Sequence, residues 1–361
     1  MRIVFILLIF MFLGLGAVNA GNIEFLPYKK NVFSPILKEK FVIPFRISEA
    51  GNVAVQIYSP DGVLIRTLSK TIESNKKDHS LIWDGKDEQG IIVPDEAYNV
   101  VLQIMINGKT ETLDPRTSSG GVVNLDLNPK INADGKMTYV IDQPSRVLIR
   151  LGLNSGALLR SVINWVPKNT GKNIQFWNGY DQDHLIKFQS HNNFKMVISA
   201  FSLVDYSVIT TGNKQSYFDY VEKYSLEPSL VAKTQRLHTA NTKRISPYFT
   251  RALTDSREPI VDFKFPDEIK RNADGIPILQ KNKSVRVKVI MNEKDALRME
   301  KAKYEITFYD DLDFIAEEEM GYVPLSWLWS PQGEKGKHIL TVNVASFKGH
   351  VGIKSIPYLI E

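Results

Sequence analysis

Cysteine is entirely absent from this chain of 361 residues. Its absence excludes disulfide bonds, thiol nucleophiles, Cys-ligated zinc and iron–sulfur clusters. A strong charge of either sign is also lacking, because 45 Lys and Arg stand against 40 Asp and Glu, a net charge of +5. So small an excess over so long a chain does not indicate binding to nucleic acid, and we expect no nucleic-acid partner.

Recognisable catalytic and metal-binding motifs are missing as well. The six histidines include no pair four residues apart, the spacing of a helical zinc site, and no Gly-x-Ser-x-Gly is present. We therefore predict that the chain is not an enzyme, with no catalytic residue, no metal and no cofactor. A hydrolase with carboxylates dispersed over the domains stays open as a third hypothesis, since the separation of such carboxylates depends on the fold.

The first twenty residues have the three-part order of a secretory signal peptide. Arg2 is followed by an uncharged apolar run from Ile3 to Val18, and Asn19-Ala20 then precedes Gly21. This order predicts cleavage after Ala20, the alternative being an uncleaved membrane anchor. No later segment is apolar enough to cross a membrane. We therefore expect a periplasmic or extracellular protein without a membrane span once the signal has been removed.

An internal repeat is the strongest pattern in the remainder of the chain. Residues 45–87 align with residues 139–181 at a constant offset of 94, without gaps. The pairs that carry the repeat are Trp83 with Trp177, Asp84 with Asn178, Gly85 with Gly179, and Asp87 with Asp181. Since a repeat this long is a domain rather than a solenoid unit, we predict that each Trp fills a core and each Asp caps a turn. The alternative, a calcium loop, lacks enough converging oxygens.

Around these motifs the sequence alternates as β-strands do. Val53, Val55 and Ile57 are spaced two apart, and Pro60-Asp61-Gly62 marks the following turn. Short strands with turn signals every 8–12 residues favour an all-β sandwich. The second copy repeats this order, and a third alternating region begins at Val285.

Residues 33–105 resemble the immunoglobulin-like domain of the flagellar hook-capping (FlgD-like) family. The likeness is carried by Ser48–Val53, by Gly62 with Arg66-Thr67-Leu68, by the run Trp83–Gly90, and by Val93-Pro94. Glu96 departs from the family pattern, which has Gly there, and in the second copy His184 replaces the second Gly of the run. The resemblance implies a β-sandwich module used as a spacer, scaffold or docking unit in exported proteins.

The sequence thus predicts an all-β protein of tandem immunoglobulin-like β-sandwiches joined by an irregular linker. The last sandwich is similar to generic bacterial immunoglobulin-like domains, with one short helix expected at Glu293–Lys303. The predicted boundaries are 1–20 for the signal peptide, 21–112 for the first sandwich, 122–213 for the diverged second copy, 214–275 for an irregular basic linker, and 276–361 for the third sandwich.

Three segments are candidates for binding. The basic linker offers Lys243, Arg244, Tyr248 and Arg251 as a site for an acidic partner or an anionic glycan, the alternative being a solvated linker. Tyr217, Tyr220 and Tyr224 form either an aromatic sugar platform or a packing surface, and packing is favoured. The acidic stretch 310–319 is either a calcium site or a solvated loop, and the loop is favoured.

The leading functional hypothesis is an exported, non-enzymatic scaffold or docking protein. It would bind an unidentified protein partner in the cell envelope or outside the cell. The alternative is an accessory module that binds a carbohydrate or an anionic envelope polymer through the tyrosine-rich and basic segments.

Overall fold

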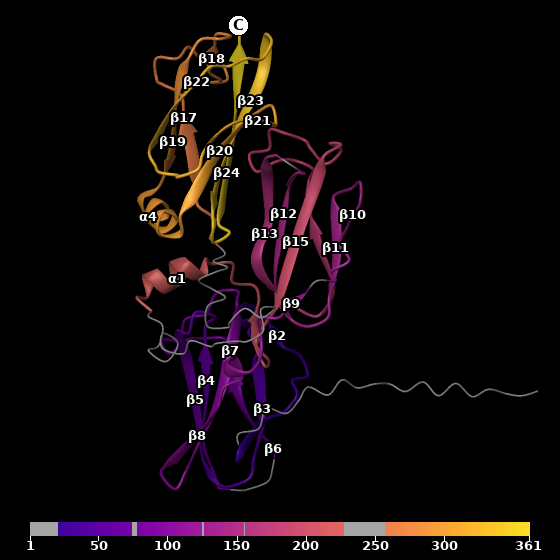
Figure 1. Cartoon of the computed structure of the whole chain (residues 1–361). Coiled ribbons are helices and arrows are strands. Elements are labelled where there is room, and N and C mark those ends of the chain that lie inside the picture. Colours follow the sequence, from indigo (N-terminus) through magenta and orange to yellow (C-terminus); the bar gives the residue numbers. More distant parts are fainter. Residues whose placement is uncertain (1–20, 74–77, 125, 155, 227–256) are drawn as a thin grey trace, which may run out of the picture.

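A computed structural model of the chain describes residues 21–73, 78–124, 126–154, 156–226 and 257–361. Strands dominate it, and they form three two-sheet sandwiches with separate hydrophobic cores (Figure 1). The all-β prediction is confirmed. The predicted signal peptide and the basic-linker candidates Lys243, Arg244, Tyr248 and Arg251 lie outside the described residues.

The first sandwich packs a three-stranded sheet, in the order β1-β3-β6, against a larger sheet in the order β2-β16-β7-β4-β5, with β8 paired to β7. Its strands are β1 (Ile23–Phe25), β2 (Val32–Phe33), β3 (Phe41–Ile47), β4 (Gly51–Tyr58), β5 (Leu64–Ile72), β6 (Asp78–Trp83), β7 (Ala97–Ile106), β8 (Lys109–Leu113) and β16 (Val208–Thr210). Alternate residues of β4 point inward, as the spacing of Val53, Val55 and Ile57 predicted. Between the two sheets lies Trp83, which is fully buried.

The second sandwich has the sheets β10-β11-β14 and β13-β12-β15-β9. Its strands are β9 (Val123–Asn124), β10 (Lys130–Ile131), β11 (Lys136–Ile141), β12 (Ser145–Leu153), β13 (Leu158–Lys168), β14 (Gly171–Phe176) and β15 (Phe194–Ser202). Trp177 occupies its core as Trp83 occupies the first. Each repeat therefore builds its own core.

The third sandwich has the sheets β17-β19-β22 and β18-β24-β23-β20-β21. Its strands are β17 (Val261–Lys264), β18 (Ile278–Leu279), β19 (Val285–Met291), β20 (Tyr304–Asp310), β21 (Asp313–Glu318), β22 (Leu325–Trp329), β23 (Gly336–Ser346) and β24 (Val351–Ile360). Helix α4 (Glu293–Ala302) joins β19 to β20, where the sequence indicated a short helix. The side chain of Asn292 caps it by accepting a hydrogen bond from the Asp295 N–H at 2.8 Å.

Three elements depart from the boundaries that the sequence indicated. Strand β16 follows the second sandwich in the chain, yet it inserts between β2 and β7 of the first. Helix α1 (Tyr217–Lys223) then packs on the first core, within the stretch 214–275 that was expected to be irregular. Strand β17 of that same stretch belongs to the third sandwich. Short apolar triplets such as Val208–Thr210 show an extended backbone, but they do not show which sheet they complete.

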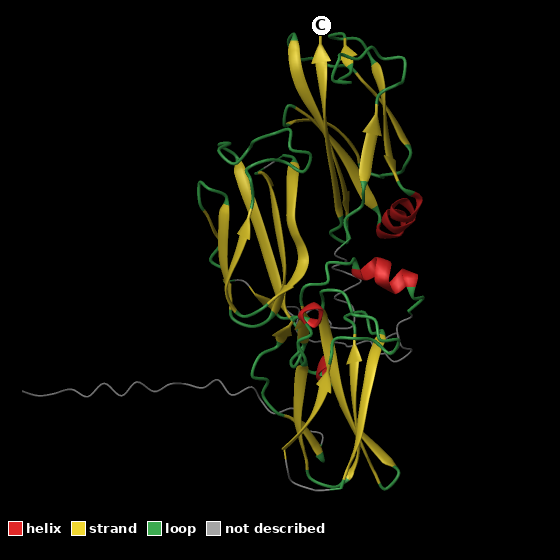
Figure 2. Cartoon of the chain, turned by 180° about the vertical axis from the view of Figure 1, so that it is seen from behind, coloured by secondary structure: helices red, strands yellow, loops and turns green. Residues whose placement is uncertain are grey.

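The second and third sandwiches lie side by side, as both views show (Figures 1 and 2). Asn343 of β23 exchanges two hydrogen bonds of 2.8 Å with the backbone of Leu158 on β13. Asp183 accepts hydrogen bonds of 2.6 Å from Lys354 and from the Ser355 N–H. Tyr309 of the third sandwich is buried in the core of the second. Polar and apolar contacts together hold the two sandwiches in one arrangement.

Candidate functional site

The two Trp-Asp loops share the same internal geometry. Trp83 Nε1 donates a hydrogen bond of 2.9 Å to the Lys86 carbonyl, and Trp177 Nε1 donates one of 2.6 Å to the Tyr180 carbonyl. Gly85 and Gly179 have φ of +74° and +87°. These positive values account for glycine at both positions.

The carboxylates of these loops mainly accept hydrogen bonds from the chain itself, although Asp181 Oδ2 is buried without a hydrogen-bond partner among the described residues. Asp87 Oδ1 accepts two backbone N–H bonds of 2.9 Å, and its Oδ2 accepts a bond of 2.7 Å from the hydroxyl of Tyr220 on α1. Asp181 Oδ1 likewise accepts bonds from Leu185 and Ile186 N–H, at 2.6 and 2.9 Å. Asp84 and Asn178 each accept a bond of 3.2 Å from the backbone N–H two residues on. Oxygens that accept N–H and O–H donors in this way organise turns and are not arranged as calcium ligands.

At position 184 the second loop departs from the first. His184 stands where the first copy has Gly90, and its φ of +60° lies in the same left-handed region as the +80° of Gly90. Both residues also donate their N–H to the carbonyl of the loop aspartate. The turn is therefore kept although its glycine is replaced.

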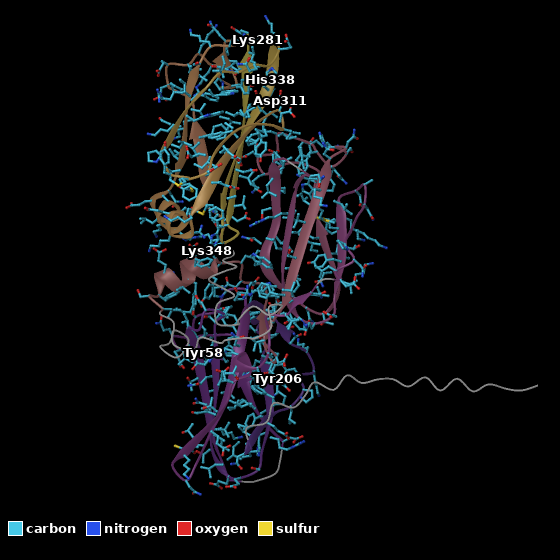
Figure 3. The ribbon with its side chains drawn as sticks, in the orientation of Figure 1. Tyr58, Tyr206, Lys281, Asp311, His338 and Lys348 are labelled. Carbon is cyan, nitrogen blue, oxygen red and sulfur yellow. The ribbon has the colours of Figure 1, made fainter. Side chains whose placement is uncertain are left out.

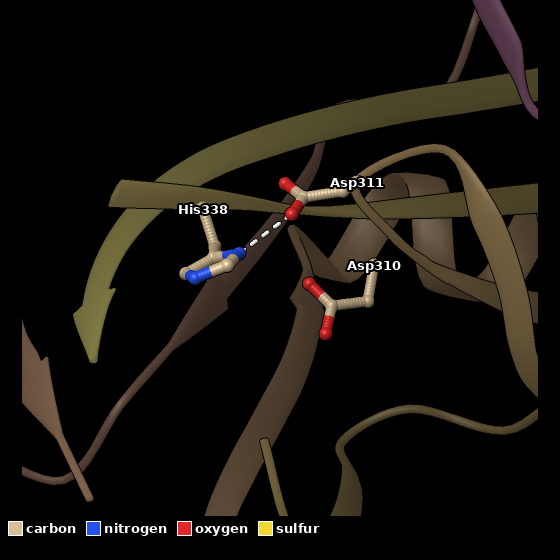
Figure 4. A group of neighbouring side chains, drawn as sticks. All are labelled: Asp310, Asp311 and His338. Carbon is tan, nitrogen blue, oxygen red and sulfur yellow. Dashed lines mark hydrogen bonds and ion pairs between the residues drawn. The ribbon is translucent and has the colours of Figure 1, made fainter. Parts of the chain in front are cut away.

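One cluster combines an imidazole with carboxylates. Asp310, Asp311 and His338 bring their ligand atoms within 4.8 Å of one another at the start of the acidic stretch (Figures 3 and 4). His338 Nδ1 lies 2.6 Å from Asp311 Oδ2, and its Nε2 lies 2.6 Å from the Glu334 carbonyl oxygen. A doubly protonated imidazole would donate to both of these acceptors. In that state the cluster is an ion pair that ties the β20–β21 turn to β23.

The stability of this turn should depend on pH. Burial lowers the pKa of His338, but the hydrogen bonds to Asp311 and Glu334 and the charges of Asp311 and Asp310 outweigh it and raise the pKa above its usual value. The protonated imidazole therefore stabilises the folded state fully below the pKa of His338 in the unfolded chain, about 6.5. This stabilisation is lost as the pH rises through the higher pKa of His338 in the folded state. Partial burial also raises the pKa of the Asp310 carboxyl, which titrates in a separate, more acidic range.

We expect His338→Gln to remove this alkaline decline. The measurement is the thermal unfolding midpoint of wild type and variant between pH 5 and 9. The difference between them should shrink toward high pH, where the wild-type imidazole has lost its charge. A constant difference across this range would show that the ion pair does not contribute.

An exposed hollow lies on the third sandwich. This groove has a volume of about 690 Å³ and runs between α4, the β21–β22 loop and the β23–β24 turn. Helix α4 contributes Glu293, Ala296, Leu297 and Glu300, whose i, i+3, i+4, i+7 spacing forms a single face of the helix. Met320 and Phe347, with exposed fractions of 81% and 78%, form part of its apolar lining. Exposed apolar side chains gathered in one place mark a binding surface.

The walls of the groove are tied to one another. The Gly321 N–H donates a hydrogen bond of 2.7 Å to the Tyr304 carbonyl, and the Phe347 N–H donates one of 3.1 Å to the Lys303 carbonyl. A Cβ at Gly321 would lie 2.4 Å from the ring of Tyr304, so the loop packs closely there. Burial raises the pKa of Tyr304 to about 12, which keeps its hydroxyl neutral. The groove is thus largely preformed.

Acidic side chains surround the groove. The residues that line it include three carboxylates, Glu293, Glu300 and Glu319, and one cationic side chain, Lys303. Within the described part of the chain, none of these three carboxylates forms an ion pair. The groove therefore suits an apolar segment that carries positive charge.

The sequence reasoning did not identify the groove. Its residues come from positions 293–304, 319–323 and 347, and only the helix had a detectable pattern. The nearest signal was apolar Met320 and Tyr322 beside the acidic stretch. Of the tyrosines considered as a sugar platform, Tyr217 and Tyr220 are buried against the first core. They therefore serve packing.

No family model and no curated protein matches the chain. Among solved structures, FlgD from P. aeruginosa is similar at 25% identity, covering 27% of this chain and 69% of that one, with a TM-score of 0.21. Fibronectin(III)-like modules of Clostridium thermocellum CbhA align at 11% identity over 94% of both chains, with a TM-score of 0.21. A structure from a bacterial ice-binding adhesin aligns at 9% identity over 94% of this chain and 98% of that one, with a TM-score of 0.19. TM-scores this low carry no inference about function.

Among the described helices, none has the length and apolar character needed to cross a membrane.

Proposed function

We propose that the chain is an exported, non-enzymatic scaffold that docks a protein partner through the groove of its third sandwich. The observation that carries the proposal is the preformed apolar groove, whose edge carboxylates form no ion pair with any described residue. A groove lined by apolar side chains and bordered by charge has the composition of a protein interface. The first two sandwiches, as diverged FlgD-like modules, would hold this surface away from the rest of the assembly.

Export is part of the same proposal. It is supported by the apolar run from Ile3 to Val18 and by the small residues before Gly21.

Site-specific photocrosslinking tests the proposal. A photoreactive phenylalanine analogue at Phe347 in the full chain should yield a covalent adduct with a protein in native envelope preparations. The same analogue at Met105, an exposed position on the first sandwich, should not. Met320→Glu should reduce the adduct at position 347 at least about tenfold, the loss expected for a central interface residue.

Equal adducts from positions 347 and 105, or no adduct at either, would contradict docking at the groove. Because the side chain of Met320 is exposed, its substitution should leave the unfolding temperature unchanged. That measurement separates loss of binding from loss of folding.

A further inference from the structure

A second unpartnered surface lies on the second sandwich, and its charge is opposite to that of the groove. On the outer face of the sheet β10-β11-β14, Phe176 lies opposite Lys136 and Val140 lies opposite Lys172, with Ile174 between them. Phe176 is 66% exposed, and Ile174 and Val140 are exposed as well. Lys130 of β10 lies opposite Thr138, beside this apolar stripe. We call these six side chains the lysine face: Lys130, Lys136, Val140, Lys172, Ile174 and Phe176.

The lysines of this face are not neutralised. Within the residues that the structure describes, Lys130, Lys136 and Lys172 form no ion pair with a carboxylate. Since four residues of a strand span about 13 Å, Lys136 and Lys172 lie at opposite ends of the apolar stripe. The arrangement is an apolar centre bordered by positive charge.

The first sandwich provides an internal comparison. In the repeat alignment, the first copy has Arg46 where the second has Val140, and Asp78 where the second has Lys172. Arg46 forms ion pairs of 2.8 Å with both Asp78 and Glu24. The same sheet face is thus neutralised in the first copy and cationic in the second. The positive charge is therefore a feature of the second copy and not of the module.

The groove and the lysine face carry opposite charges, and both have an apolar centre. The groove is hollow, apolar and bordered by Glu293, Glu300 and Glu319, while the lysine face is flat with a projecting Phe176. They belong to different sandwiches and lie on opposite sides of the molecule: β10 and β11 are at the side away from the third sandwich, and α4 is at the other (Figures 1 and 2). One copy therefore cannot satisfy both surfaces by folding upon itself.

We propose that the partner of the groove is a second copy of this chain, which docks through its lysine face. This inference rests on the proposed docking function of the groove and names its occupant. The interface is heterologous, so each added copy leaves one free groove and one free lysine face, and the chains join head to tail. Phe176 enters the groove beside Leu297 and Met320, and the lysines meet the carboxylates at its edge.

Charge reversal tests this assembly in the purified full-length protein. Sedimentation velocity of the wild type should show a mass that rises with protein concentration and falls with added salt. A face variant, K130E/K136E/K172E, has two acidic surfaces. A groove variant, E293K/E300K/E319K, has two basic surfaces. Each variant alone should need at least about tenfold more protein to associate, because like charges now meet.

Mixing the two variants should restore association. The basic face of the groove variant meets the acidic groove of the face variant, and the reversed pair is complementary as well. A matched control, K70E/K109E/K195E, reverses three exposed lysines on other strands and should associate as the wild type does. This control separates the lysine face from the overall net charge.

Three results would overturn the inference. One is a wild type that stays monomeric at about 1 mM protein, and another is a mixture that associates no better than its components. The third is a crosslink from position 347 that maps to residues 230–254 of the same chain or to a different protein. Capture of a different protein by an otherwise monomeric chain would leave the docking function standing and remove only the second copy as its partner.

Discussion

Arg146→Met is expected to lower the free energy of unfolding by about 3–5 kcal/mol, the cost of removing one member of a buried ion pair. Arg146 of β12 forms an ion pair with Glu96 of the first sandwich, and the two side chains are only 2% and 3% exposed. Glu96 also accepts a hydrogen bond of 2.7 Å from the Ala97 N–H, and Arg146 donates one of 3.0 Å to the Trp165 carbonyl. The pair thus joins the first two sandwiches at a site that is buried from bulk solvent.

The double variant E96L/R146M should be much closer to the wild type than either single variant. The double variant removes the ion pair as a whole, and apolar replacements of similar volume are often nearly neutral. Chemical denaturation followed by tryptophan fluorescence measures the cycle. Arg46→Met is the matched control, since its ion pairs at 2.8 Å are exposed and should contribute less than about 1 kcal/mol.

A loss below about 1 kcal/mol for Arg146→Met would show that this interface is open to water. Small-angle scattering of the single variant would then give the same dimensions as the wild type, whereas a broken interface should lengthen the particle.

Glu96 illustrates what the sequence could and could not predict. Its departure from the glycine of the resembling family was visible, but a single chain does not show that an arginine 50 residues later lies against it. The offset of 94 was informative because tryptophan and glycine are rarely interchangeable, so their recurrence indicates the same backbone. Ion pairs between domains have no comparable local signal.

The groove and the lysine face also could not be predicted from the sequence, for two different reasons. The groove joins three separate segments, and only α4 had a pattern that predicted its structure. The lysine face was present in the aligned repeats as a change from Arg46 and Asp78 to Val140 and Lys172. Its meaning required the strand register, because a shift of one residue would turn these side chains into the core.

Tyr220→Ala is expected to destabilise the first sandwich by about 3–5 kcal/mol, the range for removing a large buried aromatic side chain. Tyr220 is fully buried in the first core, although α1 follows the whole second sandwich in the chain. Its hydroxyl donates a hydrogen bond of 2.7 Å to Asp87 Oδ2. Burial and this bond to Asp87 raise the pKa of Tyr220, so the hydroxyl remains a donor throughout the physiological range.

Tyr220→Phe separates the contribution of the hydroxyl to stability from that of the ring. It keeps the packing and leaves the Asp87 oxygen without its donor, at a cost of about 1–3 kcal/mol. Tyr224→Ala is the control, because the side chain of Tyr224 is only half-buried at the end of the same helix. The measurement is chemical denaturation, with hydrogen exchange of the β4 and β7 amides to assign the loss to the first sandwich.

We expect the loss of stability to be largest for Tyr220→Ala, smaller for Tyr220→Phe and smallest for Tyr224→Ala. This order would show that a segment following the second sandwich in the chain completes the first sandwich. Strand β16 contributes to the same closure, since it pairs with both β2 and β7. Equal losses for Tyr220→Ala and Tyr224→Ala would instead mean that α1 rests on the surface. Because the chain enters the second sandwich and then returns to the first, unfolding of the first sandwich should disturb the segment that leaves the second.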